Sequence, residues 1–94
     1  MLIVAGWLDV AAADRDAYVT ATRPITEHAR TSTGCLDFVQ APDPADPERI
    51  LVYERWASAE DLDRFRASAG PEPDLPELLR ADVRRYRIAA VEPA

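Results

Sequence analysis

Residues 49–56, with the sequence RILVYERW, limit the possible folds more than any other segment of the chain. The side chains of an extended strand alternate between two faces, and here both faces carry large apolar residues. One face holds Ile50, Val52, Glu54 and Trp56, and the other holds Leu51, Tyr53 and Arg55. Because a strand of this kind needs cover on both sides, we expect it in a sheet that is packed on both faces.

The rest of the chain alternates between strand-like and helix-like patterns. Short runs of apolar, β-branched and aromatic residues predict strands, and apolar residues three or four positions apart predict helices. Ser58, followed three positions later by Asp61, is typical of a helix start, because each side chain can bond the first turn. The predicted strands are residues 2–9, 35–40, 49–56 and 83–91, and the predicted helices are residues 11–31 and 58–68.

Prolines set several of the expected boundaries. Pro24 lies inside the first helical pattern, where it removes a backbone hydrogen bond, so we expect a kink there or a split into two helices. Residues 41–48, APDPADPE, predict a hairpin-like connection. Residues 69–76 predict a loop, and the following sequence PELLRAD predicts a short helical piece before the last strand.

The resulting order is β-α-β-β-α-β, which predicts an α+β, ferredoxin-like fold for residues 1–94 as a single domain. Such a fold has a four-stranded antiparallel sheet with both helices on one face. The other face would carry apolar side chains, among them Ile3, Trp7, Leu51 and Tyr53. We therefore expect a homodimer in which two sheets pack face to face.

Composition excludes several classes of protein. The 94 residues include no apolar run long enough to cross a membrane, and the first residues, MLIVAGWLDV, lack the features of a signal peptide. These observations predict a cytoplasmic protein. A net charge of −6 argues against a nucleic-acid partner. With one cysteine and one histidine, the chain offers no Cys-rich or His-cluster metal site, so no metal is expected.

Residues 34–68 carry a resemblance to a known family. Gly34-Cys35-Leu36 opens one strand, Asp43-Pro44 and Asp46-Pro47 form a turn, Tyr53-Glu54 and Trp56 close the next strand, and Ser58 to Phe65 begin a helix. In this order and spacing, the segment resembles the central part of the antibiotic biosynthesis monooxygenase domain. The first and last strands also fit, so the resemblance covers nearly the whole chain.

The resemblance implies a dimeric α+β barrel built from ferredoxin-like protomers. Members of the family include small monooxygenases that oxidise anthrone-type or quinol substrates to quinones with O₂, without flavin, haem or metal. Other members degrade haem with an axial histidine after the second helix. Residues 69–82 contain no histidine, and the first strand has Ala5-Gly6-Trp7 where haem degraders have an asparagine, so haem degradation is not expected here.

Trp56 and Glu54 are the first candidates for the site. The resemblance implies that Trp56 lines a pocket between sheet and helices, where an indole could stack on a flat aromatic substrate and its N–H could hold a substrate oxygen. Trp56 could equally be core filler at the end of the strand. Glu54 shares the face of Trp56 and could act as a base towards a phenolic proton, or it could form an ion pair with Arg85 or Arg87.

Four further residues complete the candidate set. His28, late in the first helix, is either a pocket base or a residue that favours the helix C-terminus. Phe65 and Tyr86 are candidate substrate contacts, and Tyr86 could instead border the dimer interface. Arg80 could orient a substrate oxygen, or it could lie on a solvated helix face.

Gly6, Trp7 and Cys35 have simpler expected roles. Gly6 inside a strand marks a close approach, either of a ligand or of a bulge. Trp7 is expected at the dimer interface, and Cys35 as a small buried apolar residue.

The sequence leaves three functions open. The first is a cofactor-independent monooxygenase acting on a small aromatic, quinol or anthrone-type molecule. The second is a non-catalytic, small-ligand-binding or stress-associated dimeric barrel. The third is a lyase or isomerase that uses Glu54 or His28 as its base; it requires Glu54 to be free of an arginine partner. The first requires Trp56 to face a cavity that solvent can reach.

Overall fold

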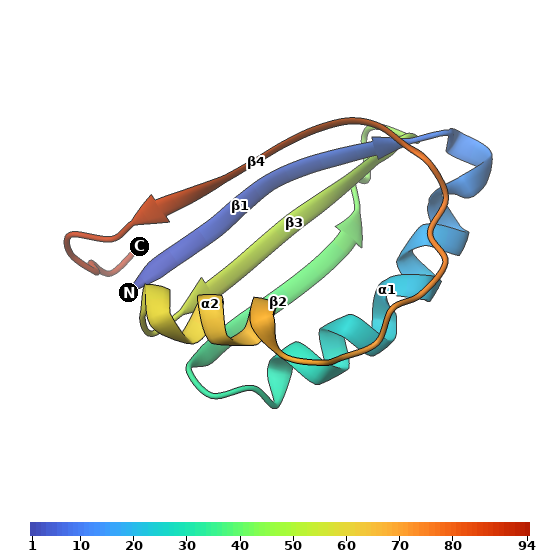
Figure 1. Cartoon of the computed structure of the whole chain (residues 1–94). Helices are drawn as coiled ribbons and strands as arrows, with labels where there is room; N and C mark the ends of the chain where they lie inside the picture. The colour runs from blue at the N-terminus through green and yellow to red at the C-terminus, as the bar shows by residue number, and fades with distance from the viewer.

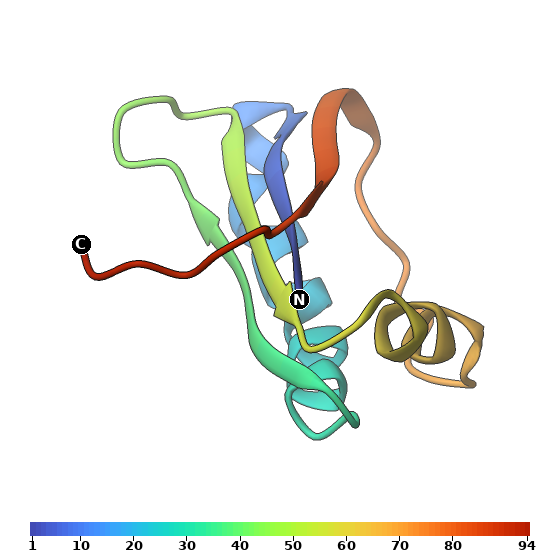
Figure 2. The same cartoon turned by 90° about the vertical axis from the view of Figure 1, so that its left-hand side faces the viewer.

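The computed structural model describes all residues from Met1 to Ala94 and has the predicted order of elements. A four-stranded sheet with the spatial order β2-β3-β1-β4 has antiparallel pairing throughout. Helices α1 and α2 lie on one side of this sheet, as the two views in Figures 1 and 2 show. The elements are β1 (Leu2–Val10), a 3-10 turn (Ala12–Asp14), α1 (Arg15–Arg30), β2 (Cys35–Pro42), β3 (Arg49–Trp56), α2 (Ala59–Ala67) and β4 (Leu78–Arg87).

The strand register decides which side chains meet the helices. On the helix side, Trp56 of β3 pairs with Leu2 of β1 and Cys35 of β2, and Glu54 pairs with Val4 and Phe38. The alternation predicted for β3 is confirmed, because its even-numbered residues are buried and Leu51 and Tyr53 are exposed.

The core consists of two apolar clusters between the sheet and the helices. The first cluster lies beneath α2 and the end of α1, and Trp56 and Leu62 are its largest fully buried members. The second cluster lies beneath the start of α1. The members of the first cluster are Leu2, Val4, Ala29, Phe38, Trp56 and Leu62. The members of the second cluster are Leu8, Val10, Tyr18, Ile50 and Val52.

Helix α2 begins as predicted. The Ser58 hydroxyl accepts a hydrogen bond from the backbone N–H of Asp61 at 3.1 Å and lies 2.9 Å from a carboxylate oxygen of Asp61. This cap satisfies one of the free N–H groups of the first turn and fixes the angle at which the chain leaves β3. The buried face of α2 is therefore placed over Trp56.

Helix α1 runs unbroken from Arg15 to Arg30, so of the two alternatives expected at Pro24 the split into two helices is wrong. Pro24 and Thr20, whose carbonyl loses its helical partner, both lie on the exposed side of α1, where water can bond that carbonyl. On the opposite side, Tyr18, Thr22 and Ala29 are buried, and their packing against the sheet holds the helix together.

The short helix expected in PELLRAD is also wrong, because β4 already begins at Leu78 and ends at Arg87 rather than spanning 83–91. β4 pairs with β1 along the whole of β1, from Leu2 opposite Arg87 to Val10 opposite Leu78. The backbone hydrogen bonds of this pairing outweigh the helical preference of a few leucines and charged residues.

Gly6 has a structural explanation. A Cβ atom at Gly6 would collide with the backbone of Asp82 and Val83 in β4, and Gly6 has a φ of +154°. The close approach expected at Gly6 is therefore that of the neighbouring strand, and neither a ligand nor a bulge is involved.

The second face of the sheet has no cover within the chain. Its exposed apolar side chains include Val39, Leu51, Tyr53 and Tyr86. Trp7 lies on the same face, where the Arg49 guanidinium sits 3.9 Å from the centre of its ring. No helix in the structure is long and apolar enough to span a membrane.

Candidate active site

The centre of the candidate site is Glu54, in the middle of the helix-side face of β3. Its side chain is 8% exposed, although it is a carboxylate. One of its oxygens accepts a hydrogen bond from the Trp56 indole N–H at 3.0 Å. Its strand neighbours at the same level are Val4 and Phe38, both buried and apolar.

Glu54 has no arginine partner, so the expected ion pair with Arg85 or Arg87 is wrong. Arg85 lies on the same face but bonds Asp63 of α2 at 3.3 Å. Burial raises the pKa of the Glu54 carboxyl above its ordinary value, and the indole hydrogen bond and the charge of Arg66 only partly oppose this rise. A carboxyl in this environment holds a proton more readily than an exposed one, and it can accept a proton in a dry site.

Trp56 is fully buried. The Phe65 ring covers it, with ring centroids 5.2 Å apart and planes tilted by 33°. From the sequence we expected the indole N–H to hold a substrate oxygen. In this conformation it donates to Glu54 instead. The solvent-reachable cavity beside Trp56 that the monooxygenase hypothesis requires is therefore not present in this conformation, because Phe65 closes over the indole.

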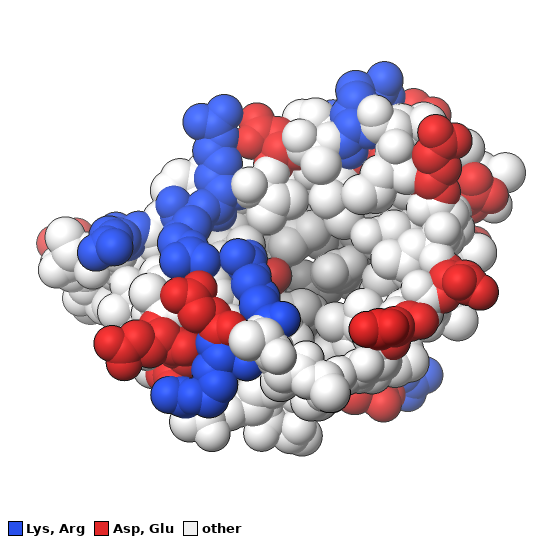
Figure 3. Space-filling view, in the orientation of Figure 1, with Lys and Arg blue, Asp and Glu red and all other residues white.

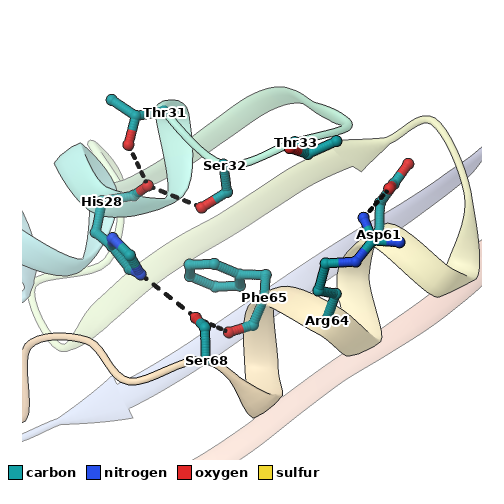
Figure 4. Close-up of a pocket in the computed structure, with 8 residues that line it drawn as sticks. All are labelled: His28, Thr31, Ser32, Thr33, Asp61, Arg64, Phe65 and Ser68. Atoms are coloured by element: carbon teal, nitrogen blue, oxygen red, sulfur yellow. Dashed lines mark hydrogen bonds and ion pairs between the residues drawn. The ribbon is translucent and has the colours of Figure 1, made fainter.

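His28 and Phe65 lie together between the two helices. Their ring centroids are 5.5 Å apart, and the His28 Nε2 lies 3.5 Å from the hydroxyl of Ser68, which itself donates to the Phe65 carbonyl at 2.7 Å. Figure 4 shows these groups around a cavity of about 290 Å³ between the end of α1 and α2. The structure thus brings His28, Phe65, Trp56 and Glu54 into one continuous region.

A second cavity, of about 240 Å³, lies on the other side of the His28–Phe65 pair. Ile25 and Phe65 are part of its lining, and both pack against the core cluster that contains Trp56. The segment after α2 supplies Gly70, Pro71 and Glu72 to its wall. Figure 3 shows a hollow on this side of the molecule, with basic and acidic side chains mixed on the rim that carries α2 and mainly acidic side chains on the opposite rim. We call this second space the α2-loop cavity.

Arg80 and Tyr86 lie away from this region. Both are on the uncovered face of the sheet, because Arg80 pairs with Asp9 and Tyr86 with Ile3 in the β1–β4 register. The Arg80 guanidinium bonds the Asp9 carboxylate at 3.2 Å and lies 3.7 Å from Glu48. The expectation that Arg80 orients a substrate beside Trp56 is therefore not met, and Tyr86 borders the open face.

Sequence reasoning missed the charged cluster around Asp9. Asp9 is buried, with 3% of the residue exposed, and its carboxylate accepts two hydrogen bonds from Arg49, at 2.9 and 3.2 Å, besides the one from Arg80. A polar residue at the end of an apolar strand could have signalled it, but the sequence did not show which arginines would meet it. The cluster ties β1, β3 and β4 together.

Cys35 is partly buried beside the first cluster, and burial together with the nearby Glu54 charge raises the pKa of its thiol. It is therefore an unreactive apolar side chain in this setting. No group of three or more His, Cys, Asp or Glu side chains is arranged to hold a metal ion.

The family model for antibiotic biosynthesis monooxygenases matches residues 1–72, which is most of the chain. The chain belongs to this family, abbreviated ABM below. The match spans β1 to the segment after α2 and so includes Glu54, Trp56, His28 and Phe65. No curated protein matches this ABM-family chain.

Solved structures agree with this assignment at the level of the fold. A candidate antibiotic biosynthesis monooxygenase from Deinococcus radiodurans is similar with a TM-score of 0.82 and 18% identity, covering 100% of this chain and 98% of that one. A second, from Chloroflexus aurantiacus, has a TM-score of 0.69 and 21% identity, with coverages of 98% and 96%. The heme degrader MhuD from Mycobacterium tuberculosis has a TM-score of 0.72 and 16% identity, with coverages of 99% and 100%.

Proposed function

We propose that this ABM-family chain oxidises a small aromatic, quinol or anthrone-type molecule with O₂, in the space between the sheet and the two helices. The observation that carries the proposal is Glu54, a buried carboxylate with no cationic partner. A buried charge of this kind costs stability, and such groups cluster at functional sites.

The proposed reaction needs only the substrate and O₂. Glu54 accepts a proton from the acidic methylene or phenol of the substrate, which leaves an electron-rich anion able to pass electrons to O₂. For an anthrone, the CH₂ group loses two hydrogens and gains one oxygen atom to become the second quinone carbonyl. The other oxygen atom leaves as water, so four electrons pass from the substrate to O₂.

The roles of the neighbouring residues follow from their positions. Trp56 holds the Glu54 carboxylate through its N–H, which makes it a positioning residue. Phe65 offers the aromatic surface that a flat substrate would meet first, because it lies between Trp56 and the two cavities. His28, beside Phe65, is the second candidate proton acceptor.

A non-catalytic ligand-binding role is the second candidate. It is favoured by one observation, namely that Phe65 covers Trp56 and no cavity in the structure reaches the indole. A substrate that must approach Glu54 therefore requires the Phe65 side chain to move. A ligand that is only bound could remain above Phe65.

We further propose that the working form is a cytoplasmic homodimer that buries the uncovered sheet face. Exposed Leu51 and Tyr53 occupy the middle of that face. Leu51→Glu places a charge there and is expected to shift the mass in light scattering from dimer to monomer. A wild-type protein that is already monomeric at micromolar concentration would contradict this.

The oxidation is tested by oxygen uptake of metal-free protein with a panel of anthrones and hydroquinones. Glu54→Gln keeps the shape of the side chain and its hydrogen bond acceptor but removes the base, and a general base typically contributes about 10²–10⁴-fold in rate. We expect saturable uptake with quinone formation in the wild type and a loss of this order in the variant. Glu60→Gln, at an exposed position of α2, is the matched control.

Two outcomes would count against the proposal. Uptake that equals the buffer rate across the panel, together with ligand-induced thermal stabilisation, would favour the binding role. Uptake that survives Glu54→Gln would exclude Glu54 as the base and move the assignment to His28.

A further inference from the structure

Arg66 is one of two arginines in the chain that have no hydrogen-bond or ion-pair partner. Of the eleven arginines, nine bond a carboxylate or a backbone carbonyl, and only Arg66 and Arg87 do not. Arg87 lies at the end of β4, away from the His28–Phe65 pair, whereas Arg66 lines the α2-loop cavity with that pair. The unpaired guanidinium thus borders the space proposed for the substrate.

The helix period explains why Arg66 reaches this space. It follows the fully buried Leu62 by four residues and Phe65 by one, so it lies at the edge of the inward-facing side of α2. The neighbouring Arg85–Asp63 ion pair holds that side of α2 against β4. Arg66 therefore lies on the side of α2 that faces the cavity, and it is exposed.

Arg66 lines the same cavity as Phe65. The Phe65 ring in turn covers Trp56, whose N–H bonds Glu54. The charge of Arg66 is close enough to favour ionised Glu54, yet the two side chains form no ion pair. Glu72, also without an ion-pair partner, lines the wall of the α2-loop cavity that the following loop provides. The cavity thus has a cation on its helix wall and an anion on its loop wall, and Glu54 lies outside its lining.

We propose that Arg66 selects substrates that carry a carboxylate in addition to the oxidisable ring. The planar guanidinium binds a carboxylate with two parallel hydrogen bonds, which fixes orientation as well as affinity. With the carboxylate held at the rim, the ring of the substrate extends along Phe65 towards Glu54. This inference rests on the proposed function for the direction of the ring, but the binding of the carboxylate can be measured without turnover.

The test uses equilibrium binding of two probes that are already at the quinone level and are not oxidised further by O₂, an anthraquinone carboxylate and its primary carboxamide, followed by calorimetry. We expect the wild type to bind the carboxylate at least about tenfold more tightly than the amide, and Arg66→Gln to abolish that preference while leaving amide binding unchanged. Arg66→Lys should retain part of the preference because it keeps the charge. Arg23→Gln, which removes an exposed arginine of α1 from a surface ion pair, is the matched control and should behave as the wild type.

A further variant tests whether the charge of Glu72 opposes binding of the carboxylate probe. Glu72→Gln removes the opposing carboxylate and should tighten binding of the carboxylate probe but not of the amide. Equal affinities for both probes in the wild type, or a preference that survives Arg66→Gln, would overturn the inference. An Arg66-dependent preference in a protein that consumes no oxygen would support the inference and count against the proposed oxidation alone.

Discussion

Replacing Trp56 with phenylalanine tests whether the indole holds Glu54 in place. The variant keeps an aromatic ring in the core but removes the N–H that donates to the Glu54 carboxylate at 3.0 Å. Both side chains are buried, so water cannot easily replace the lost donor. We expect the loss of stability in Trp56→Phe to depend on the charge of residue 54.

The structure allows the size of the effect to be worked out. A hydrogen bond to a charged group contributes roughly 1.5–3 kcal/mol, and the smaller ring leaves a gap worth about 1–2 kcal/mol in the core. The free energy of unfolding should therefore fall by roughly 3–5 kcal/mol in Trp56→Phe. In the Glu54→Gln background the lost bond is a neutral one, worth about 0.5–1.5 kcal/mol, so the coupling between the two sites should be about 1–2 kcal/mol.

The assay is a double-mutant cycle measured by urea unfolding, with far-UV circular dichroism as the signal because Trp56→Phe alters fluorescence. The cycle is run at pH 8 and repeated near pH 4, where Glu54 is expected to be protonated and the coupling to shrink. Free-energy changes that add to within about 0.5 kcal/mol at pH 8 would refute the reasoning. They would mean that Trp56 only fills the core and that Glu54 is held by other groups.

Three further predictions follow from single residues. Glu54→Gln should remove one term of the pH dependence of stability. Because the pKa of Glu54 is raised, its contribution to the free energy of unfolding is fully present below the ordinary value of 4.5 and is lost as pH rises through the raised value, which a pH series of urea midpoints for the two proteins will show. Asp9→Asn should destabilise the protein at neutral pH. The hydrogen bond from Arg49, and then that from Arg80, lowers the pKa of Asp9. The ionised Asp9 therefore stabilises the fold above the ordinary pKa of 3.8, and this stabilisation is lost as pH falls through the lowered pKa. A stability difference between wild type and Asp9→Asn that persists in acid would contradict this. Gly6→Ala should cost at least about 2 kcal/mol in unfolding free energy, because the new methyl group meets the β4 backbone, whereas Gly70→Ala meets only the movable His28 ring and should cost little.

The fold could be predicted from the sequence where local signals agree with the tertiary structure. The bounds of β3 and the Ser58 cap are two such places, because alternation and capping both act within a few residues. The start of β4 could not be predicted, because Leu78 becomes extended only through its pairing with Val10 in β1. The split at Pro24, one of two alternatives expected there, is wrong for a related reason: the burial of Tyr18 and Ala29 on the opposite side of α1 outweighs the local loss of one hydrogen bond.

The candidate site could be predicted only in part. The face shared by Glu54 and Trp56 follows from alternation, and the resemblance to the family drew attention to both residues. The partner of Glu54 did not follow, because the sequence offered Arg85 on the same face, and only the structure shows Arg85 engaged by Asp63. Arg80 was misplaced for the same reason as the start of β4, since its face depends on the register with β1.

The contrast between Asp9 and Glu54 gives a physical reason to place function at Glu54. These are the only buried carboxylates among the 17 acidic residues of the chain. Asp9 is surrounded by two guanidinium groups, so its charge contributes to the stability of the fold and lowers its pKa. Glu54 has only an indole N–H, so its charge costs stability and its pKa rises. A glutamine at position 54 would keep an acceptor for the Trp56 N–H without the cost of a buried charge. Under the proposed function, the carboxylate is retained in spite of that cost because it accepts a proton from the substrate.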